Sequence, residues 1–254
     1  DSRWSLLEEF GRLAKEVKPE LITMENVPDL YRHTVFTEFV KTLEKNGYYV
    51  SHSVVYCPDY GIPQSRKRLV LLASKFGNPR LIEPTHQPSE YITLKHTIGN
   101  LPQLKAGKSH KSDPLHRAAG LSDINRRRIK ASKQGGSWKD WPNELLTACH
   151  KKESGKKYTS IYGRMHWDKP SPTITTQFYN YGSGRHGHPT QLRAISLREA
   201  ALLQSFPADY QFTDKESFSI TDISRMIGNA VPVRLGEVIG RSFSKHLTEL
   251  QINH

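Results

Sequence analysis

Three charged residues stand beside two apolar segments, where their side chains could together bind a planar base. Glu25 follows the apolar residues 21–24. Arg66 and Arg68 alternate just before the apolar residues 69–73. A carboxylate and a guanidinium at neighbouring strand ends can bracket a base, one at a ring nitrogen and the other at a ring carbonyl. Taken singly, the acid is more typical of a helix cap or a solvated turn, and the arginines are more typical of surface charge.

The composition favours a polyanionic partner and a reducing compartment. The 254 residues carry a net charge of +12 and a pI near 9.6, although lysine-rich surfaces also serve solubility alone. The two cysteines, Cys57 and Cys149, show neither disulfide nor metal-ligand spacing, and His150, His186 and His188 complete no common metal site. We therefore predict no metal and a cytoplasmic, prokaryotic setting. No apolar run reaches the length of about 18 residues that a membrane span requires.

The first 76 residues predict the C-terminal half of a doubly wound α/β sheet. Apolar residues at helical spacing indicate a helix that ends at Lys18-Pro19, because proline lacks a backbone donor. A second helix should end at Asn46-Gly47, a good C-terminal cap. Residues 21–24, 48–57 and 69–73 are expected as strands, the last buried on both faces as parallel strands usually are.

The rest of the chain changes character twice. Residues 77–192 show no clean period and predict a smaller, loop-rich, mainly β domain with short strands such as 173–176. Residues 193–254 are expected as closing helices that pack back on the first domain. Ser196 and Glu199 form a capping-box pattern, and Pro232 suits the first turn of the last helix.

Four segments, in this order, resemble the later motifs of the DNA cytosine-5 methyltransferases. They are Glu25-Asn26-Val27, the residues Gly-Ile-Pro-Gln-Ser-Arg-Lys-Arg at 61–68, residues 193–210, and Gly-Asn-Ala-Val-Pro at 228–232. The resemblance implies a Rossmann-like S-adenosylmethionine methyltransferase sheet and a target-recognition domain at residues 77–192. The Pro-Cys-Gln segment that carries the nucleophile of that family is absent from these residues.

The resemblance also implies a role for each candidate. Glu25 would meet N3 of a flipped cytosine, Arg68 would contact O2 and position Glu25, and Arg66 would support the pocket. Asn229 and Ala230 match positions that touch S-adenosylmethionine, although Gly-Asn at a helix end is commonly only a cap.

Further candidates concern double-stranded DNA. Thr173 matches a threonine placed near the phosphate of the flipped nucleotide, with a plain strand residue as an equal alternative. Tyr179, Tyr181 and Arg185 belong to a glycine-bearing loop suited to reading base edges, or to a plain surface loop. The basic cluster Arg126, Arg127 and Arg128 would meet phosphates if it meets DNA at all.

Without the nucleophile, we predict that this polypeptide alone transfers no methyl group. The start at Asp1 suggests the C-terminal portion of a longer enzyme or a subunit of a split one. The expected partners are DNA, a missing N-terminal half or separate catalytic subunit, and a second copy paired through the exposed edge of strand 21–24. The alternatives are a non-catalytic DNA-binding module and a partner subunit of a split methyltransferase. The sequence does not separate restriction-modification from stand-alone methylation.

Overall fold

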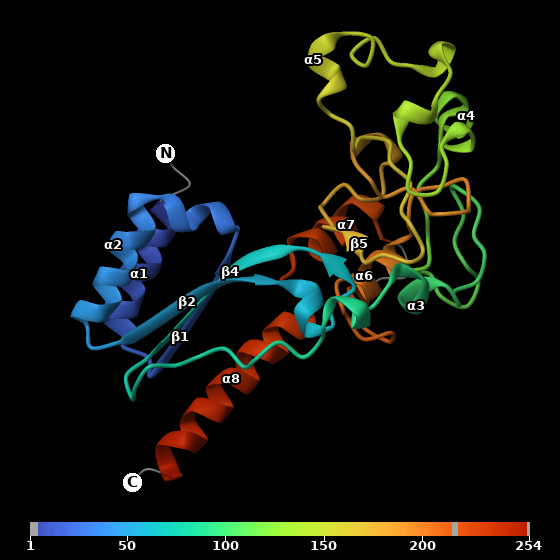
Figure 1. Cartoon of the computed structure of the whole chain (residues 1–254). Coiled ribbons are helices and arrows are strands. Elements are labelled where there is room, and N and C mark those ends of the chain that lie inside the picture. Colours follow the sequence, from blue (N-terminus) through green and yellow to red (C-terminus); the bar gives the residue numbers. More distant parts are fainter. Residues whose placement is uncertain (1–4, 215–217, 253–254) are drawn as a thin grey trace. The chain divides into compact units, whose positions relative to one another are not determined.

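The computed structural model describes residues 5–214 and 218–252, which form two compact units (Figure 1). The first unit comprises residues 1–60, 66–87 and 234–254, and the second comprises residues 61–65 and 88–233. These units cross the predicted boundaries, because the region after residue 192 is shared between them. The role of residues 77–192 as a target-recognition domain stays a prediction.

The first unit is built on a three-stranded sheet in the order β1 (Leu21–Asn26), β4 (Lys67–Ser74), β2 (Tyr49–Tyr56). Strand β4 is antiparallel to both neighbours. The prediction of parallel neighbours for residues 69–73 was therefore wrong. This strand is apolar throughout because it is the central strand and helices cover both of its faces, and burial of both faces does not depend on strand direction.

Helices flank the sheet of the first unit on both sides (Figure 1). Helices α1 (Ser5–Val17) and α2 (Thr34–Lys45) share a core with alternate residues of β4. On the opposite face lies α8 (Val233–Ile252), whose His246 Nε2 is 2.9 Å from Ser74 Oγ. The helix that was predicted to begin near Pro232 therefore packs on this sheet, as expected.

The predicted helix ends are confirmed. Helix α1 stops before Lys18, which has a φ of 49°, and α2 stops before Asn46 and Gly47, whose φ of 83° suits glycine. Only some of the apolar residues at helical spacing in α1 face the core: Leu7 and Ala14 are buried, whereas Leu6 is 77% exposed and Val17 70%.

The second unit is loop-rich, as predicted, but it is not mainly β. Its described residues pair only the two-residue strands β3 (Gln64–Ser65) and β5 (Ser171–Pro172), besides isolated bridges. The predicted strand at 173–176 is irregular backbone. The α-helices are α3 (Leu94–Ile98), α4 (Asp123–Ala131), α5 (Glu153–Lys156), α6 (Leu197–Leu203) and α7 (Ile220–Asn229). Helix α7 was not predicted.

Short 3₁₀ helices connect many of these elements. They are η1 (Pro28–Arg32), η2 (Cys57–Tyr60), η3 (Pro88–Glu90), η4 (Trp138–Asp140), η5 (Asn143–Leu145) and η6 (Tyr181–Ser183). The core of the second unit gathers α3, α6 and α7 around buried aliphatic side chains such as Ile195, Leu203 and Ile227. Aromatic residues of η4, η6 and the loops beside them form a smaller cluster next to α4. The unit is thus held by many short segments, each of which depends on contacts distant in sequence.

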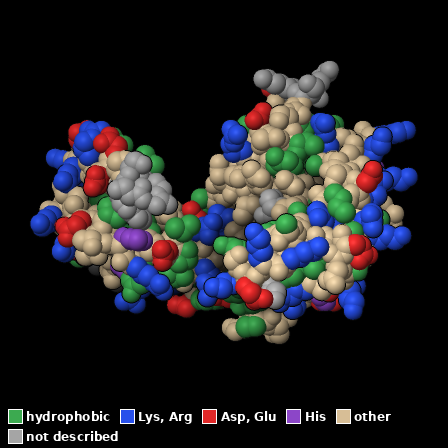
Figure 2. Space-filling view, turned by 90° about the horizontal axis from the view of Figure 1, so that it is seen from above, with side chains coloured by type: hydrophobic (Ala, Val, Ile, Leu, Met, Phe, Trp, Pro, Cys, Tyr) green, Lys and Arg blue, Asp and Glu red, His purple; other side chains and the backbone are tan. Residues whose placement is uncertain are grey.

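Charge does not single out one face of the visible surface. Figure 2 shows lysine and arginine side chains spread over both units, with acidic side chains among them. On the face shown, basic side chains are therefore distributed broadly, and individual residues must identify a DNA-binding surface. Within the described part of the chain, no helix combines the length and apolar character that crossing a membrane would require.

Candidate functional site

The structure brings Glu25, Arg66 and Arg68 together in the first unit. Glu25 lies within β1 rather than just past its end, as was predicted, and stands opposite Val70 of β4. Because side chains alternate along a strand, Arg68 shares a face with Val70 and with Glu25. The Glu25 Oε1 lies 2.7 Å from Arg68 Nε and 3.9 Å from Arg66 Nη2.

These three side chains are largely withdrawn from water. Their exposed fractions are 16% for Glu25, 14% for Arg68 and 5% for Arg66. Burial, together with the neighbouring Arg68 cation, lowers the pKa of Arg66 to about 10, so Arg66 stays protonated at neutral pH. Although Glu25 Oε1 forms a close ion pair with Arg68 Nε, it is a buried oxygen without a hydrogen bond. The cluster therefore retains an acceptor that a ligand donor could satisfy.

Cys57 lacks the properties of a nucleophile for this cluster. Cys57 is fully buried beside it, and its backbone N–H donates to the carbonyl of Arg66 at 2.8 Å. Burial raises the pKa of the Cys57 thiol to about 11, so the thiolate is scarce at neutral pH. Cys149 belongs to the other unit, where its exposed thiol lies 2.9 Å from Thr147 Oγ1.

Thr173 lies in the second unit, where two hydrogen bonds hold it. Its hydroxyl donates to the carbonyl of Ser65 at 3.0 Å, next to the pairing of β3 with β5. Nε2 of His186 donates to the carbonyl of Thr173 at 3.1 Å. Burial lowers the pKa of His186 to about 4, so this histidine is neutral at neutral pH. The position of Thr173 is thus set by buried or backbone groups rather than by a mobile loop.

The predicted base-reading loop divides into buried and accessible residues. Tyr181 is 1% exposed, and its hydroxyl lies 3.2 Å from Ser132 Oγ. Burial raises the pKa of Tyr181 to about 12. A core side chain does not reach a DNA groove, and Tyr181 does not fit the alternative of a plain surface loop either. Tyr179 is half-buried against the main core cluster, and Arg185 is exposed.

The basic cluster on α4 divides in the same way. Arg126 and Arg127 are exposed, as phosphate contacts would require. The guanidinium of Arg128 instead lies 5.1 Å from the ring centre of Trp141 and 5.4 Å from that of Tyr162. It also donates to the carbonyl of Leu145 at 3.0 Å. Arg128 therefore stabilises the aromatic cluster through cation–π contacts.

Asn229 and Ala230 end helix α7 in the second unit. Asn229 is exposed and is the last helical residue, and the carbonyl of Ala230 accepts from Gln204 Nε2 at 3.3 Å. A Cβ added at the preceding Gly228 would meet the backbone nitrogen of Thr176 at 2.5 Å. A glycine is therefore needed for α7 to approach this backbone.

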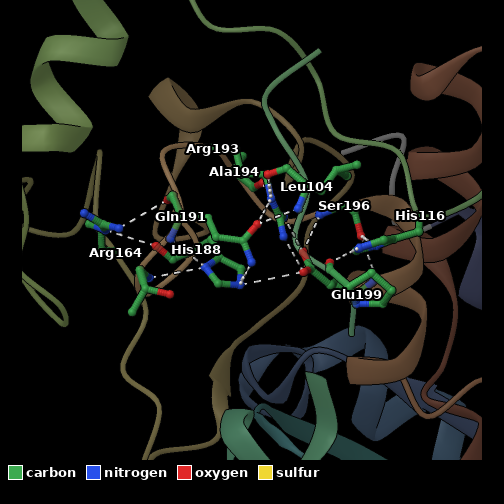
Figure 3. Close-up of polar contacts among 11 residues, drawn as sticks. Leu104, His116, Arg164, His188, Gln191, Arg193, Ala194, Ser196 and Glu199 are labelled. Atoms are coloured by element: carbon green, nitrogen blue, oxygen red, sulfur yellow. Dashed lines mark hydrogen bonds and ion pairs between the residues drawn. The ribbon is translucent and has the colours of Figure 1, made fainter. Parts of the chain in front are cut away.

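The sequence prediction missed a buried ion pair in the second unit (Figure 3). The Arg193 guanidinium donates to both carboxylate oxygens of Glu199, at 2.6 and 2.7 Å. The predicted capping box is confirmed, since Glu199 also accepts from the backbone N–H of Ser196. Burial would raise the pKa of Glu199, but the hydrogen bonds and charge of Arg193 outweigh it and lower the pKa. The signal that could have found this pair is an arginine three residues before the capping box.

Two buried histidines border this ion pair. His188 Nε2 lies 3.8 Å from Glu199 Oε1, and burial lowers the pKa of His188 to about 4. His116 Nδ1 lies 2.9 Å from the hydroxyl of Ser196. Both rings are thus part of this polar network, and the described residues contain no group of three His, Cys, Asp or Glu side chains that could hold a metal ion.

A family model and curated relatives match the chain over nearly its whole length. The model of the C-5 cytosine-specific DNA methylases matches residues 1–245. The type II methylase M.HgiDII of Herpetosiphon aurantiacus is 55% identical, covering 98% of this chain and 71% of the relative. The type II methyltransferase M1.HphI of Haemophilus parahaemolyticus is 34% identical, covering 96% of this chain and 62% of the relative. The chain thus spans roughly two thirds of the length of these relatives.

Solved structures agree on the fold. A crystal structure described as a DNA modification methyltransferase of an Escherichia coli prophage has a TM-score of 0.68 at 20% identity, covering 98% of this chain and 75% of that one. The Entamoeba histolytica methyltransferase EhMeth has a TM-score of 0.54 at 17% identity, covering 89% of this chain and 63% of that one. At these identities the likeness concerns the fold alone.

Proposed function

Because the chain belongs to the C-5 cytosine-specific DNA methylase family, we propose that it binds a cytosine extruded from double-stranded DNA for methylation at C5. The observation that carries this proposal is the buried cluster of Glu25, Arg66 and Arg68, which includes a carboxylate oxygen without a hydrogen bond. A cytosine has a ring nitrogen and a ring carbonyl that match an acid and a guanidinium. The relatives are type II enzymes, which supports a restriction-modification role.

Each residue of the cluster has a distinct part in the proposed chemistry. Glu25 supplies a proton or a strong hydrogen bond to N3 as charge develops on the ring, an effect typically worth about 10²–10⁴-fold in rate. Arg68 donates to O2 and orients Glu25, and Arg66 supports both from its buried position. These contacts also help offset the cost of flipping the base, roughly a few kcal/mol.

S-adenosylmethionine is the proposed cofactor and supplies the methyl group. Asn229 and Ala230 are the residues of this chain that we assign to it. Their chemistry fits, because the exposed amide of Asn229 can both donate and accept, and the small Ala230 leaves room beside it.

DNA contacts are proposed on the second unit. Thr173, Tyr179 and Arg185 are assigned to the nucleotides around the flipped base, and Arg126 and Arg127 to phosphates. Their accessible or part-exposed positions support this assignment. Residues 77–192 would then act as the target-recognition domain.

We further propose that these 254 residues form the C-terminal portion of the enzyme and do not transfer a methyl group by themselves. Pro-Cys-Gln is absent from them, and Cys57 is buried as a thiol. The test is to incubate the chain with DNA and labelled S-adenosylmethionine, alone and with a polypeptide that carries Pro-Cys-Gln. We expect label at cytosine C5 only in the mixture; label from the chain alone would refute the proposal.

A non-catalytic DNA-binding or partner subunit is the second candidate, favoured by the buried, protonated thiol of Cys57. The catalytic and the non-catalytic hypotheses predict different effects of Glu25→Gln on the rate of methylation in the active mixture. An acid at N3 predicts a loss of about 10²-fold or more in kcat, with DNA affinity changed much less. A non-catalytic chain predicts no change in the rate of methylation.

The unpaired edge of β1 is the proposed contact for further polypeptide. In the described residues β1 pairs with β4 alone, so its other edge has open backbone donors and acceptors. An apolar groove lined by Leu6, Phe10, Met24 and Leu30 lies beside it. A missing N-terminal half, a separate subunit or a second copy would each cover this edge. Sedimentation of the chain at high concentration tests the last option, and a clean monomer would exclude it.

A further inference from the structure

Two buried glutamines connect segments of the second unit that are far apart in the sequence. Gln64 and Gln204 are both 0% exposed. Nε2 of Gln64 donates to Oε1 of Gln204 at 2.9 Å and to the carbonyl of Leu203 at 3.2 Å. A glutamine amide accepts at its oxygen and donates from its nitrogen, so two amides in series form a hydrogen-bonded chain with a direction.

Backbone groups determine the direction of this chain at both ends. At one end the backbone N–H of Ile174 donates to Oε1 of Gln64 at 3.0 Å. At the other end Nε2 of Gln204 donates to the carbonyls of Ile227 at 2.7 Å and Ala230 at 3.3 Å. A backbone N–H only donates and a carbonyl only accepts. If either amide turned over, two acceptors or two donors would therefore face each other in a buried site.

We propose that Gln64 and Gln204 are positioning residues, whose serial amides hold the Thr173 segment in register with the segment that contains Asn229. Ile174 adjoins Thr173, and Ile227 and Ala230 flank Asn229, so the chain ends at both assigned ligand contacts. A change in amide orientation at one end is transmitted to the other, since buried hydrogen-bond networks respond as a unit. The consequence for DNA binding rests on the proposed function, whereas the structural coupling between the two ends of the amide chain does not.

The decisive variant is Gln64→Glu, which keeps the size of the side chain. Its carboxylate still accepts from Ile174, but its second oxygen now faces the Gln204 oxygen and the Leu203 carbonyl. At alkaline pH Gln204 must turn over to donate, which leaves the carbonyls of Ile227 and Ala230 without their donor. We expect hydrogen-exchange protection of residues 228–233, which the chain reaches through Gln204, to fall by about tenfold at pH 8.

The loss should depend on pH in the variant alone. A buried carboxyl that faces two acceptors takes up a proton readily, and the protonated form restores one donor to Gln204. Protection factors at residues 228–233 should therefore recover as the pH is lowered from 8 to 6, whereas those of the unsubstituted chain stay flat. A purely local packing role predicts a loss confined to residues 171–176, and that pattern would overturn the proposal.

Two matched variants keep the test decisive. Gln211→Glu introduces the same charge at an exposed position of the second unit, and it should change protection at neither segment. If Gln64→Glu does not fold, Gln64→Leu removes the donor to Gln204 without adding charge, and a smaller loss at residues 228–233 is expected. If whichever of these two Gln64 variants folds leaves protection at residues 228–233 unchanged, the proposed coupling through the two amides is wrong.

DNA affinity separates this inference from the function on which it rests. The probe is a fluorescent duplex, titrated with the chain and followed by anisotropy at pH 8. If Thr173 contacts a phosphate, Thr173→Val and Gln64→Glu should each weaken binding by about tenfold, and the double variant by less than the product. If neither variant changes affinity while the exchange effect is present, the assigned role of Thr173 fails and the amide coupling stands.

Discussion

Each of the two units contains an acid held by arginine, and the two clusters differ in how completely their hydrogen bonds are made. Around Glu199, Arg193 donates to both carboxylate oxygens and the Ser196 backbone adds a third bond, with both charged side chains at most 1% exposed. Around Glu25 the nearest guanidinium nitrogen is equally close, yet Oε1 has no hydrogen bond. A satisfied cluster stabilises a fold, whereas an unsatisfied one has capacity left for a ligand.

The largest effect should come from removing the arginine of the satisfied pair. Arg193→Leu leaves Glu199 buried without its partner, so we expect the second unit to lose about 3–5 kcal/mol of unfolding free energy. Three of the four tryptophans lie in that unit, so urea unfolding followed by tryptophan fluorescence reports on it. A cost below about 1 kcal/mol would mean that the pair behaves as a surface ion pair, and the comparison would fail.

The next largest effect should be a loss of stability of the second unit at acidic pH. His186 and His188 have pKa values lowered to about 4 by burial, so between that value and the ordinary 6.5 the unfolded chain binds more protons. Stability then rises with pH across this window and is fully present above about 6.5. Each histidine contributes up to roughly 3 kcal/mol. Tryptophan-monitored unfolding between pH 7.5 and 4.5 measures the slope, and a flat profile would show that neither ring is buried in solution.

Replacing each acid with glutamine should show that Glu199 contributes more to stability than Glu25 does. Glu199→Gln loses the charge of a carboxylate that makes three hydrogen bonds, so we expect a cost of about 1–3 kcal/mol. Glu25→Gln loses no hydrogen bond at Oε1, although it removes the counter-charge of two largely buried guanidinium groups, so it should cost less than Glu199→Gln. Thermal unfolding of both variants at pH 7.5 is the measurement. Equal costs would show that Glu25 is as structural as Glu199.

The smallest effect concerns the hydroxyl at the edge of the satisfied cluster. Ser196 Oγ accepts from the Glu199 backbone and contacts His116, so Ser196→Ala should cost about 1–2 kcal/mol. Ser122 caps α4 at an exposed position, and Ser122→Ala should cost only a few tenths to about 1 kcal/mol. If both substitutions cost the same, the buried contacts of Ser196 add nothing to its capping role.

Local signals account for the features that were predicted correctly. Pro19 and Gly47 end helices through their own backbone preferences, and Ser196 with Glu199 caps a helix within four residues. The grouping of Glu25 with Arg66 and Arg68 was also expected, although it depended on the pairing of their strands. Motif order in the sequence was sufficient for that inference, because it matched a known family.

The errors concern properties that no local window contains. The direction of β4 depends on which segments pair with it, and its apolar composition fits either direction. Tyr181 and Arg128 were assigned to DNA from their residue types, whereas Tyr181 is buried against Ser132 and Arg128 packs on the aromatic cluster, and these partners lie elsewhere in the chain.

The amino-acid sequence by itself determined the helix ends, the capping box and the residues available for base chemistry, since these follow from short-range stereochemistry and residue type. Only the tertiary structure decided which charges are satisfied and which are not. Hydrogen-bond satisfaction depends on angles and distances between groups as far apart as Gln64 and Gln204. Those angles and distances exist only after the chain has packed.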